Sequence, residues 1–357
     1  TAVFSQSDVG RYIMKKITYI FIISILFSCG REKPYPNKIS DFRTELQIHL
    51  KKLASEKKLP SSDTIARNYI KKNCTKEELL KLLKCENPII RVIAYRTLVN
   101  KNDKDYFKVL LGHLNDTTKV TWWYYEDACD DFMVSDLLIR KAEDSRKLTQ
   151  TEKKVLVDSV LMRHPYLKVS NWMLQDIEPN EKYYSIIKQR SNVKTDRCGE
   201  QLGACYALSK FKKTTDVKLL KNVFLNSDKD CVEWIFKSIE NFPNNEFFPI
   251  LQKYYEKSIV NKLSPDENVS DELLYFCRAI AAYKNKEGLK MLEYIEKNNT
   301  YINKPYWPPY NKRYVFKAIN KFKSPIYSKL LDKIRPTLNN EEMKHIFEPE
   351  YDEIKTW

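Results

Sequence analysis

The sequence predicts an all-α fold built from repeated helical hairpins, and three observations lead to this prediction. The chain has only six glycines in 357 residues, strand-like alternation is nearly absent, and apolar residues recur at helical spacing along most of its length. One such helix face, with i, i+3, i+4, i+7 spacing, consists of Val315, Ala318, Ile319 and Phe322. A second face follows after Pro325, so the two segments are expected to form a hairpin of helices.

This hairpin recurs along the chain, and one apolar residue marks the same position in the first helix of each unit. The marker residues are Leu98, Leu137, Leu174, Leu208, Ile239, Ile280 and Ile319. They are separated by roughly 31–41 residues, the period of helical-hairpin repeats. A single hairpin buries too little apolar surface to offset its conformational entropy, so the units must stack. The sequence therefore predicts a right-handed α-solenoid of about seven hairpins over residues 41–338.

One hairpin also carries a family resemblance. Asn87–Arg91, followed by Ala94 and Leu98, resembles the first helix of a HEAT repeat, and residues 110–116 resemble its second helix. Later hairpins keep the apolar pattern but lack the proline and the arginine. The resemblance therefore implies one HEAT-like hairpin. The looser repeat period extends the same hairpin pattern to the other units.

Signals at helix ends support this division. Thr75 with Glu78, and Thr149 with Glu152, have the spacing of capping boxes and predict two separate helix starts. The acidic C-terminal segment, residues 339–357, is expected to lie along the last helix pair. That pair is rich in lysine, with Lys317, Lys321, Lys323, Lys329 and Lys333.

The N-terminal region predicts export. Residues 14–28 combine two lysines with an apolar run that is too short for the ~20 residues of a membrane-spanning helix, as in a secretion signal peptide. Residues 26–29 resemble the lipobox of bacterial lipoproteins, which implies cleavage before Cys29 and acylation of its sulfur. Residues 1–13 are interpreted as a non-native upstream extension, and residues 29–40 as the lipidated cysteine and a tether. Because no Asp follows Cys29, we expect the periplasmic face of the outer membrane.

The charge distribution and the cysteine and histidine content argue against a nucleic-acid partner and against a metal site. The net charge of +15 is spread along the chain instead of forming one basic block, so nucleic acid is not the expected partner. Apart from Cys29, seven cysteines remain, several at helical spacing among apolar residues, and we expect free thiols in the core. The four histidines are scattered, and no Cys or His group has zinc spacing. No metal, cofactor or catalytic residue is therefore predicted.

Two aromatic segments are the candidate contact sites. Trp122 and Trp123 belong to a run of four aromatic residues that cannot all face one core on a helix. Tyr306, Trp307 and Tyr310 lie in a proline-broken segment that could contact a ligand or fold back over a solenoid end.

The densest acidic cluster follows the first aromatic run. It consists of Glu126, Asp127, Asp130, Asp131 and Asp136. On a helix it could hold a cation or a basic partner. We favour a solvated face balanced by Arg140 and Lys141, because a helix lacks the looped oxygen cage that calcium prefers.

These observations predict a lipid-anchored, non-enzymatic scaffold or adaptor, monomeric, that binds another protein in the bacterial cell envelope and is held to the membrane through Cys29. Two alternatives stay open: an envelope hydrolase that uses residues 122–136, and a cytoplasmic HEAT-like protein that binds nucleic acid.

Overall fold

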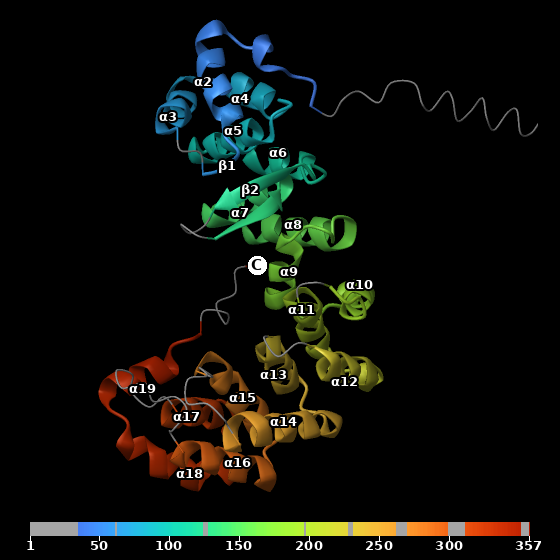
Figure 1. The fold of residues 1–357 in the computed structure, drawn as a ribbon, viewed down its shortest axis with the longest axis vertical. Helices are drawn as coiled ribbons and strands as arrows, with labels where there is room; N and C mark the ends of the chain where they lie inside the picture. Colours follow the sequence, from blue (N-terminus) through green and yellow to red (C-terminus); the bar gives the residue numbers. More distant parts are fainter. Residues whose placement is uncertain are drawn as a thin grey trace, which may run out of the picture. The chain divides into compact units, whose positions relative to one another are not determined.

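The computed structural model describes residues 35–60, 63–123, 128–195, 198–227, 231–261, 270–298, 311–350 and 357. Most of these residues are helical, which confirms the predicted fold class at this level. The chain divides into two compact units, Thr1–Lys147 and Leu148–Trp357 (Figure 1).

The first unit is organised around one buried helix. Its elements are η1 (Ile39–Asp41), α2 (Thr44–Ser55), β1 (Lys58–Leu59), α3 (Thr64–Asn73), α4 (Lys76–Leu82), α5 (Pro88–Asn100), α6 (Tyr106–Gly112), β2 (Lys119–Trp123), β3 (Cys129–Met133) and α7 (Val134–Asp144). Helix α5 packs against α2, α3, α4, α6, α7 and β2. It begins at Pro88, and the Asn87 side chain accepts hydrogen bonds from the first free backbone amides.

Within α5, Arg91 is fully buried beside the equally buried Asp116. The Arg91 Nε donates to Asp116 at 2.7 Å and one Nη donates to the other carboxylate oxygen at 3.0 Å. The remaining guanidinium nitrogen donates to the carbonyl oxygens of Cys85 and Glu86. This bidentate pair joins the two segments that resemble a HEAT unit.

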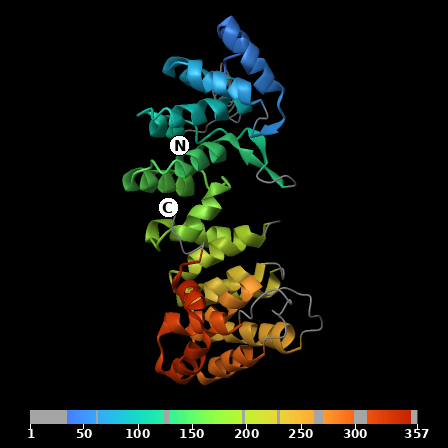
Figure 2. The same cartoon turned by 90° about the vertical axis from the view of Figure 1, so that its left-hand side faces the viewer.

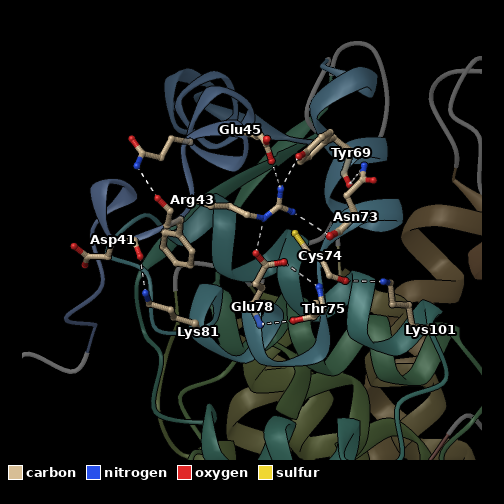
Figure 3. Close-up of polar contacts among 12 residues, drawn as sticks. Asp41, Arg43, Glu45, Tyr69, Asn73, Cys74, Thr75, Glu78, Lys81 and Lys101 are labelled. Carbon is tan, nitrogen blue, oxygen red and sulfur yellow. Dashed lines mark hydrogen bonds and ion pairs between the residues drawn. The ribbon is translucent and has the colours of Figure 1, made fainter.

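A second arginine fastens α2 to α3 and α4. Figure 3 shows Arg43 surrounded by acceptors from these helices: its Nε donates to Glu78 at 2.7 Å, and its Nη atoms donate to Glu45, to the Tyr69 hydroxyl and to the Asn73 carbonyl oxygen. Every nitrogen of the fork therefore has an acceptor, which fixes the relative positions of the three helices.

The helical interpretation of residues 122–136 is wrong over most of the described part of that segment. Strand β2 pairs in parallel with β1 and antiparallel with β3, and Trp122 lies between Leu59 and Asp130 in the sheet. The run from Val120 to Trp123 is β-branched and aromatic, and such residues fit a half-buried pleated surface better than a helix. Helix α7 starts only at Val134.

The second unit consists of helices and short helical turns in its described residues. The helices are α8 (Gln150–Arg163), α9 (Val169–Asp176), α10 (Glu181–Ser191), α11 (Cys198–Ser209), α12 (Val217–Asn226), α13 (Val232–Asn241), α14 (Phe248–Tyr254), α15 (Ser270–Ala282), α16 (Lys286–Lys297), α17 (Asn311–Phe322), α18 (Ser328–Ile334) and α19 (Asn340–Phe347). The turns are η2 (Thr214–Asp216), η4 (Asn245–Phe247), η5 (Tyr255–Val260), η6 (Pro325–Tyr327) and η7 (Arg335–Thr337).

These helices pack serially. Helices α9, α11, α13, α15, α17 and α19 each contact the next member of the series. The helices α10, α12, α14, α16 and α18 each pack against at least one member of that series. Figure 2 shows the helices of this unit in successive layers, from yellow-green to red. The seven marker residues lie on α5, α7, α9, α11, α13, α15 and α17 and are all buried.

Two finer expectations are also confirmed. Both capping boxes are present, Thr75 with Glu78 and Thr149 with Glu152. The expectation for the C-terminal segment holds only for its part up to residue 350, where α19 packs on α17 and the buried Lys317 forms an ion pair with Glu350. The backbone amide of Trp357 instead donates to Asp176 of α9.

Candidate functional site

A polar cleft in the first unit is the best candidate site. It has a volume of about 330 Å³ and is lined by residues of β1, α3, α5 and α7: Leu59, Thr64, Arg67, Asn68, Lys71, Ile93, Arg96, Thr97, Asn100 and Lys141. Four of these side chains are cations and four are neutral hydrogen-bonding groups. We call this the cationic pocket.

Helical geometry explains why these residues meet. Thr64, Arg67, Asn68 and Lys71 stand at i, i+3, i+4, i+7 on α3, and Ile93, Arg96, Thr97 and Asn100 have the same spacing on α5. The opposite side of α3 is anchored by the fully buried Ala66 and Ile70. Two helices thus present parallel polar stripes to one cleft, and α7 adds Lys141.

The electrostatics of the pocket are dominated by like charges. Burial lowers the pKa of Arg96, and the neighbouring cations Arg67 and Arg140 lower it further, while Asp144 opposes both effects. The pKa of Lys141 is also lowered, first by burial and then by the charge of Arg96. The pocket therefore disfavours positive charge on its own residues, which is the condition an anion would relieve.

Two guanidinium groups are incompletely hydrogen-bonded. The Nε atoms of Arg67 and Arg96 are buried and have no hydrogen-bond partner among the described residues. The Arg96 guanidinium carbon lies 4.4 Å from the centroid of the Trp122 ring, and Arg140 stacks on the same ring at 5.8 Å. Trp122 thus orients the arginine without accepting its Nε hydrogen.

Among the predicted contact residues, Trp122 and Trp123 have different positions. Trp122 supports the cationic pocket through Arg96. Trp123, its neighbour on β2, is half-buried and lies under Lys58, whose Nζ is 3.9 Å from the ring centroid. The structure therefore does not bring the two tryptophans together on one contact surface.

The described members of the acidic cluster do not share a helix face, and Glu126 and Asp127 lie outside the described residues. Asp130 and Asp131 lie on β3, and Asp131 accepts a hydrogen bond from the Thr121 hydroxyl at 2.8 Å. Asp136 is fully buried on α7 instead of belonging to a solvated face. Within the described residues, no group of three or more His, Cys, Asp or Glu side chains is placed to hold a metal ion.

The cysteines whose side chains the structure describes divide into three groups. Cys74, Cys85, Cys205 and Cys277 are free and buried, as predicted, and burial raises the pKa of the Cys205 thiol to about 12. Cys129 is free but exposed on β3. Cys231 is disulfide-bonded, so the expectation of free core thiols is wrong for it.

Several predicted residues lie outside the described part of the chain: Cys29 with the signal segment 14–28, and Tyr306, Trp307 and Tyr310. Among the helices that are described, none combines the length and the apolar character needed to cross a bilayer.

The pocket cations themselves were missed from the sequence. A usable signal was present, since Arg67 and Lys71 are one turn apart on a predicted helix, as are Arg96 and Asn100. What the sequence does not show is that α3 and α5 face the same cleft. No family model matches the chain, and neither the curated proteins nor the solved structures include a match to it.

Proposed function

We propose that this chain is a lipid-anchored, non-enzymatic scaffold of HEAT-like hairpins, forming a right-handed α-solenoid, that binds another protein in the bacterial cell envelope. One observation carries the proposal: helices α9, α11, α13, α15 and α17 pack in series, each with a buried marker residue at the same point of its hairpin. Serial packing of this kind is typical of repeat proteins, which present extended surfaces to large partners.

The buried pair of Arg91 and Asp116 supports the HEAT-like part of the proposal. It joins α5 to Asp116, which follows the end of α6 at Gly112, and its carboxylate also accepts from the backbone amide of Thr118. The pair thus acts as an internal brace for one hairpin.

The proposed location rests on the signal-like segment and on redox chemistry. A disulfide at Cys231 fits an oxidising compartment such as the periplasm, where such bonds persist. The lipid on Cys29 would hold the protein at the membrane, because two or more acyl chains give stable anchoring.

The cationic pocket is the proposed contact with the partner. Four cations from three helices are arranged around one cleft that the fold itself does not fill. An anionic group bound at this contact would supply the missing opposite charge.

Two measurements test this function. Mass spectrometry of the mature N-terminus should find an acylated Cys29, and an unprocessed, unmodified N-terminus would remove the anchor from the proposal. Crosslinking in intact cells should then yield a protein partner with the native chain.

That crosslink needs a matched control. The double variant Lys71→Gln and Lys141→Gln neutralises two pocket charges and should lose the partner. The variant Lys51→Gln and Lys52→Gln removes two exposed charges from α2 of the same unit and should keep it. Equal recovery of the partner by both variants would contradict a role of the pocket in scaffolding.

A further inference from the structure

The charge balance of the cationic pocket differs from that of other cations in the same unit. Lys76 lies 3.0 Å from Asp103 and also pairs with Asp105, and Arg91 is held by Asp116. By contrast, none of the four pocket cations is within ion-pair distance of a carboxylate among the described residues, although Asp144 is near enough to influence Arg96 and Lys141. A folded protein that gathers four cations around one carboxylate has an unbalanced site.

The charged groups of the pocket offer only hydrogen-bond donors. The buried Nε atoms of Arg67 and Arg96 offer N–H donors that no described residue accepts. Thr64, Thr97 and the two asparagines add hydroxyl and amide donors around them. The site is therefore rich in donors, and its complementary ligand is a compact group with several acceptor oxygens.

Among such groups, phosphate fits best. A carboxylate has one charge and two oxygens, whereas a phosphate monoester has close to two charges and three terminal oxygens that can meet two guanidinium forks. The volume of about 330 Å³ is within the lower range of small-molecule sites and is large enough for a phosphorylated small group.

We propose that the cationic pocket binds a phosphate-type oxyanion, held by Arg67, Arg96, Lys71 and Lys141. The phosphate belongs either to a soluble phosphorylated compound or to a lipid headgroup. This inference rests on the proposed function only in treating the pocket as a binding site. It does not depend on the identity of the protein partner.

The test is isothermal titration of the purified full-length chain with inorganic phosphate and with glycerol 3-phosphate, at constant ionic strength. Acetate serves as the singly charged control anion. The native chain should bind both phosphates, and acetate should bind at least about tenfold more weakly because it lacks the second charge.

Variants locate the binding. Lys71→Gln with Lys141→Gln should weaken phosphate binding by about tenfold or more, because two charge-assisted contacts are lost. The control variant Lys51→Gln with Lys52→Gln, which has the same net charge as the pocket variant, should bind phosphate like the native chain. Arg67→Lys keeps the charge but removes the fork and should give an intermediate loss. Circular dichroism of each variant confirms that it is folded.

A vesicle-binding experiment distinguishes a lipid headgroup from a soluble phosphorylated compound as the ligand. Flotation with phosphatidic acid vesicles, compared with phosphatidylcholine vesicles, should retain the native chain and release the pocket variant if a lipid headgroup is the ligand. Binding of glycerol 3-phosphate without vesicle retention assigns a soluble ligand. Both outcomes support the proposal.

Three outcomes would overturn it: no phosphate binding, equal binding by the pocket variant and its charge-matched control, or binding of poly-glutamate in place of phosphate. The last would leave the scaffold proposal intact. Specific phosphate binding without any crosslinked partner would instead remove the scaffold proposal and leave the phosphate site.

Discussion

Two regions of the molecule carry a cation at the same position of the hairpin, two residues before the buried marker, but provide it with different partners. In the first unit this residue is Arg96, whose Nε lacks an acceptor and whose charged neighbours are Asp144 and the cations Arg67 and Arg140. In the second unit, two of the three cations at this position are paired with carboxylates: Lys237 with Glu233, and Lys317 with Glu350, while Lys317 also donates to the Glu348 carbonyl oxygen at 2.8 Å. The third, Arg278, resembles Arg96 in that its buried Nε has no hydrogen-bond acceptor among the described residues.

The presence or absence of an internal carboxylate partner distinguishes cations that stabilise the fold from cations that do not. Lys317 connects α17 to the segment after α19, so its charge is used internally. Arg96 is stacked on Trp122 and turned toward a cleft, so its charge is available to a ligand. Removing an internally paired cation should therefore destabilise the protein, whereas removing a pocket cation should not.

The largest effect on stability is expected for Arg91 on α5, which is ion-paired with Asp116 and lies five residues before Arg96. Arg91→Met should lower the free energy of unfolding by roughly 3–5 kcal/mol, because it leaves the fully buried Asp116 without its counter-ion. Urea denaturation measures this change. The double variant Arg91→Met with Asp116→Leu should recover much of the loss, and equal destabilisation of the single and double variants would contradict the interpretation.

The half-buried Lys210, whose ammonium group donates to carbonyl oxygens and not to a carboxylate of the described residues, provides the next test. Lys210 donates to the carbonyl oxygens of Gln175 and Ile177, and burial lowers its pKa to about 8. Between pH 8 and about 10.5 the unfolded chain holds more protons than the folded chain, so stability rises with pH in this window. Relative to Lys210→Met, the native chain should gain up to about 3 kcal/mol from pH 7 to pH 10.

The measurement is urea denaturation of both chains at each pH. Lys218→Met, which removes an exposed lysine of α12, should show no such relative gain. A parallel pH dependence in the native chain and Lys210→Met would show that the Lys210 ammonium is solvated.

A smaller loss is expected from Lys317→Met. About 2 kcal/mol should be lost because carbonyl and carboxylate acceptors at the C-terminal segment are left unpaired. Hydrogen exchange should accelerate over residues 340–350 and stay unchanged over α13. Lys329→Met, at an exposed position on α18, is the control, and uniform acceleration throughout the second unit would contradict a local role.

The smallest effect is expected in the pocket. Lys141→Met should leave stability unchanged or raise it by about 0.5 kcal/mol, because a like charge beside Arg96 is removed and the half-buried stem is kept. Urea denaturation without added phosphate checks this. A loss comparable to that of Lys317→Met would show that Lys141 is also an internal brace.

The sequence was sufficient for the helices and their repeat because buried apolar residues at 3.6-residue spacing are a local signal. All seven marker residues, from Leu98 to Ile319, are buried on helices. The sheet was missed because its strands are short and because β1 pairs with residues about sixty positions later, a non-local contact. The pocket was missed for the same reason, since α3, α5 and α7 each contribute an ordinary polar stripe.

Strand β3 has a consequence beyond this site. Among the described strands it forms one border of the sheet, with the order β1-β2-β3, so one side of its backbone has no strand partner among the described residues. Asp130 and Asp131 place two negative charges on this border, where they repel an approaching strand. These two charges therefore disfavour edge-to-edge pairing of the sheet with another strand.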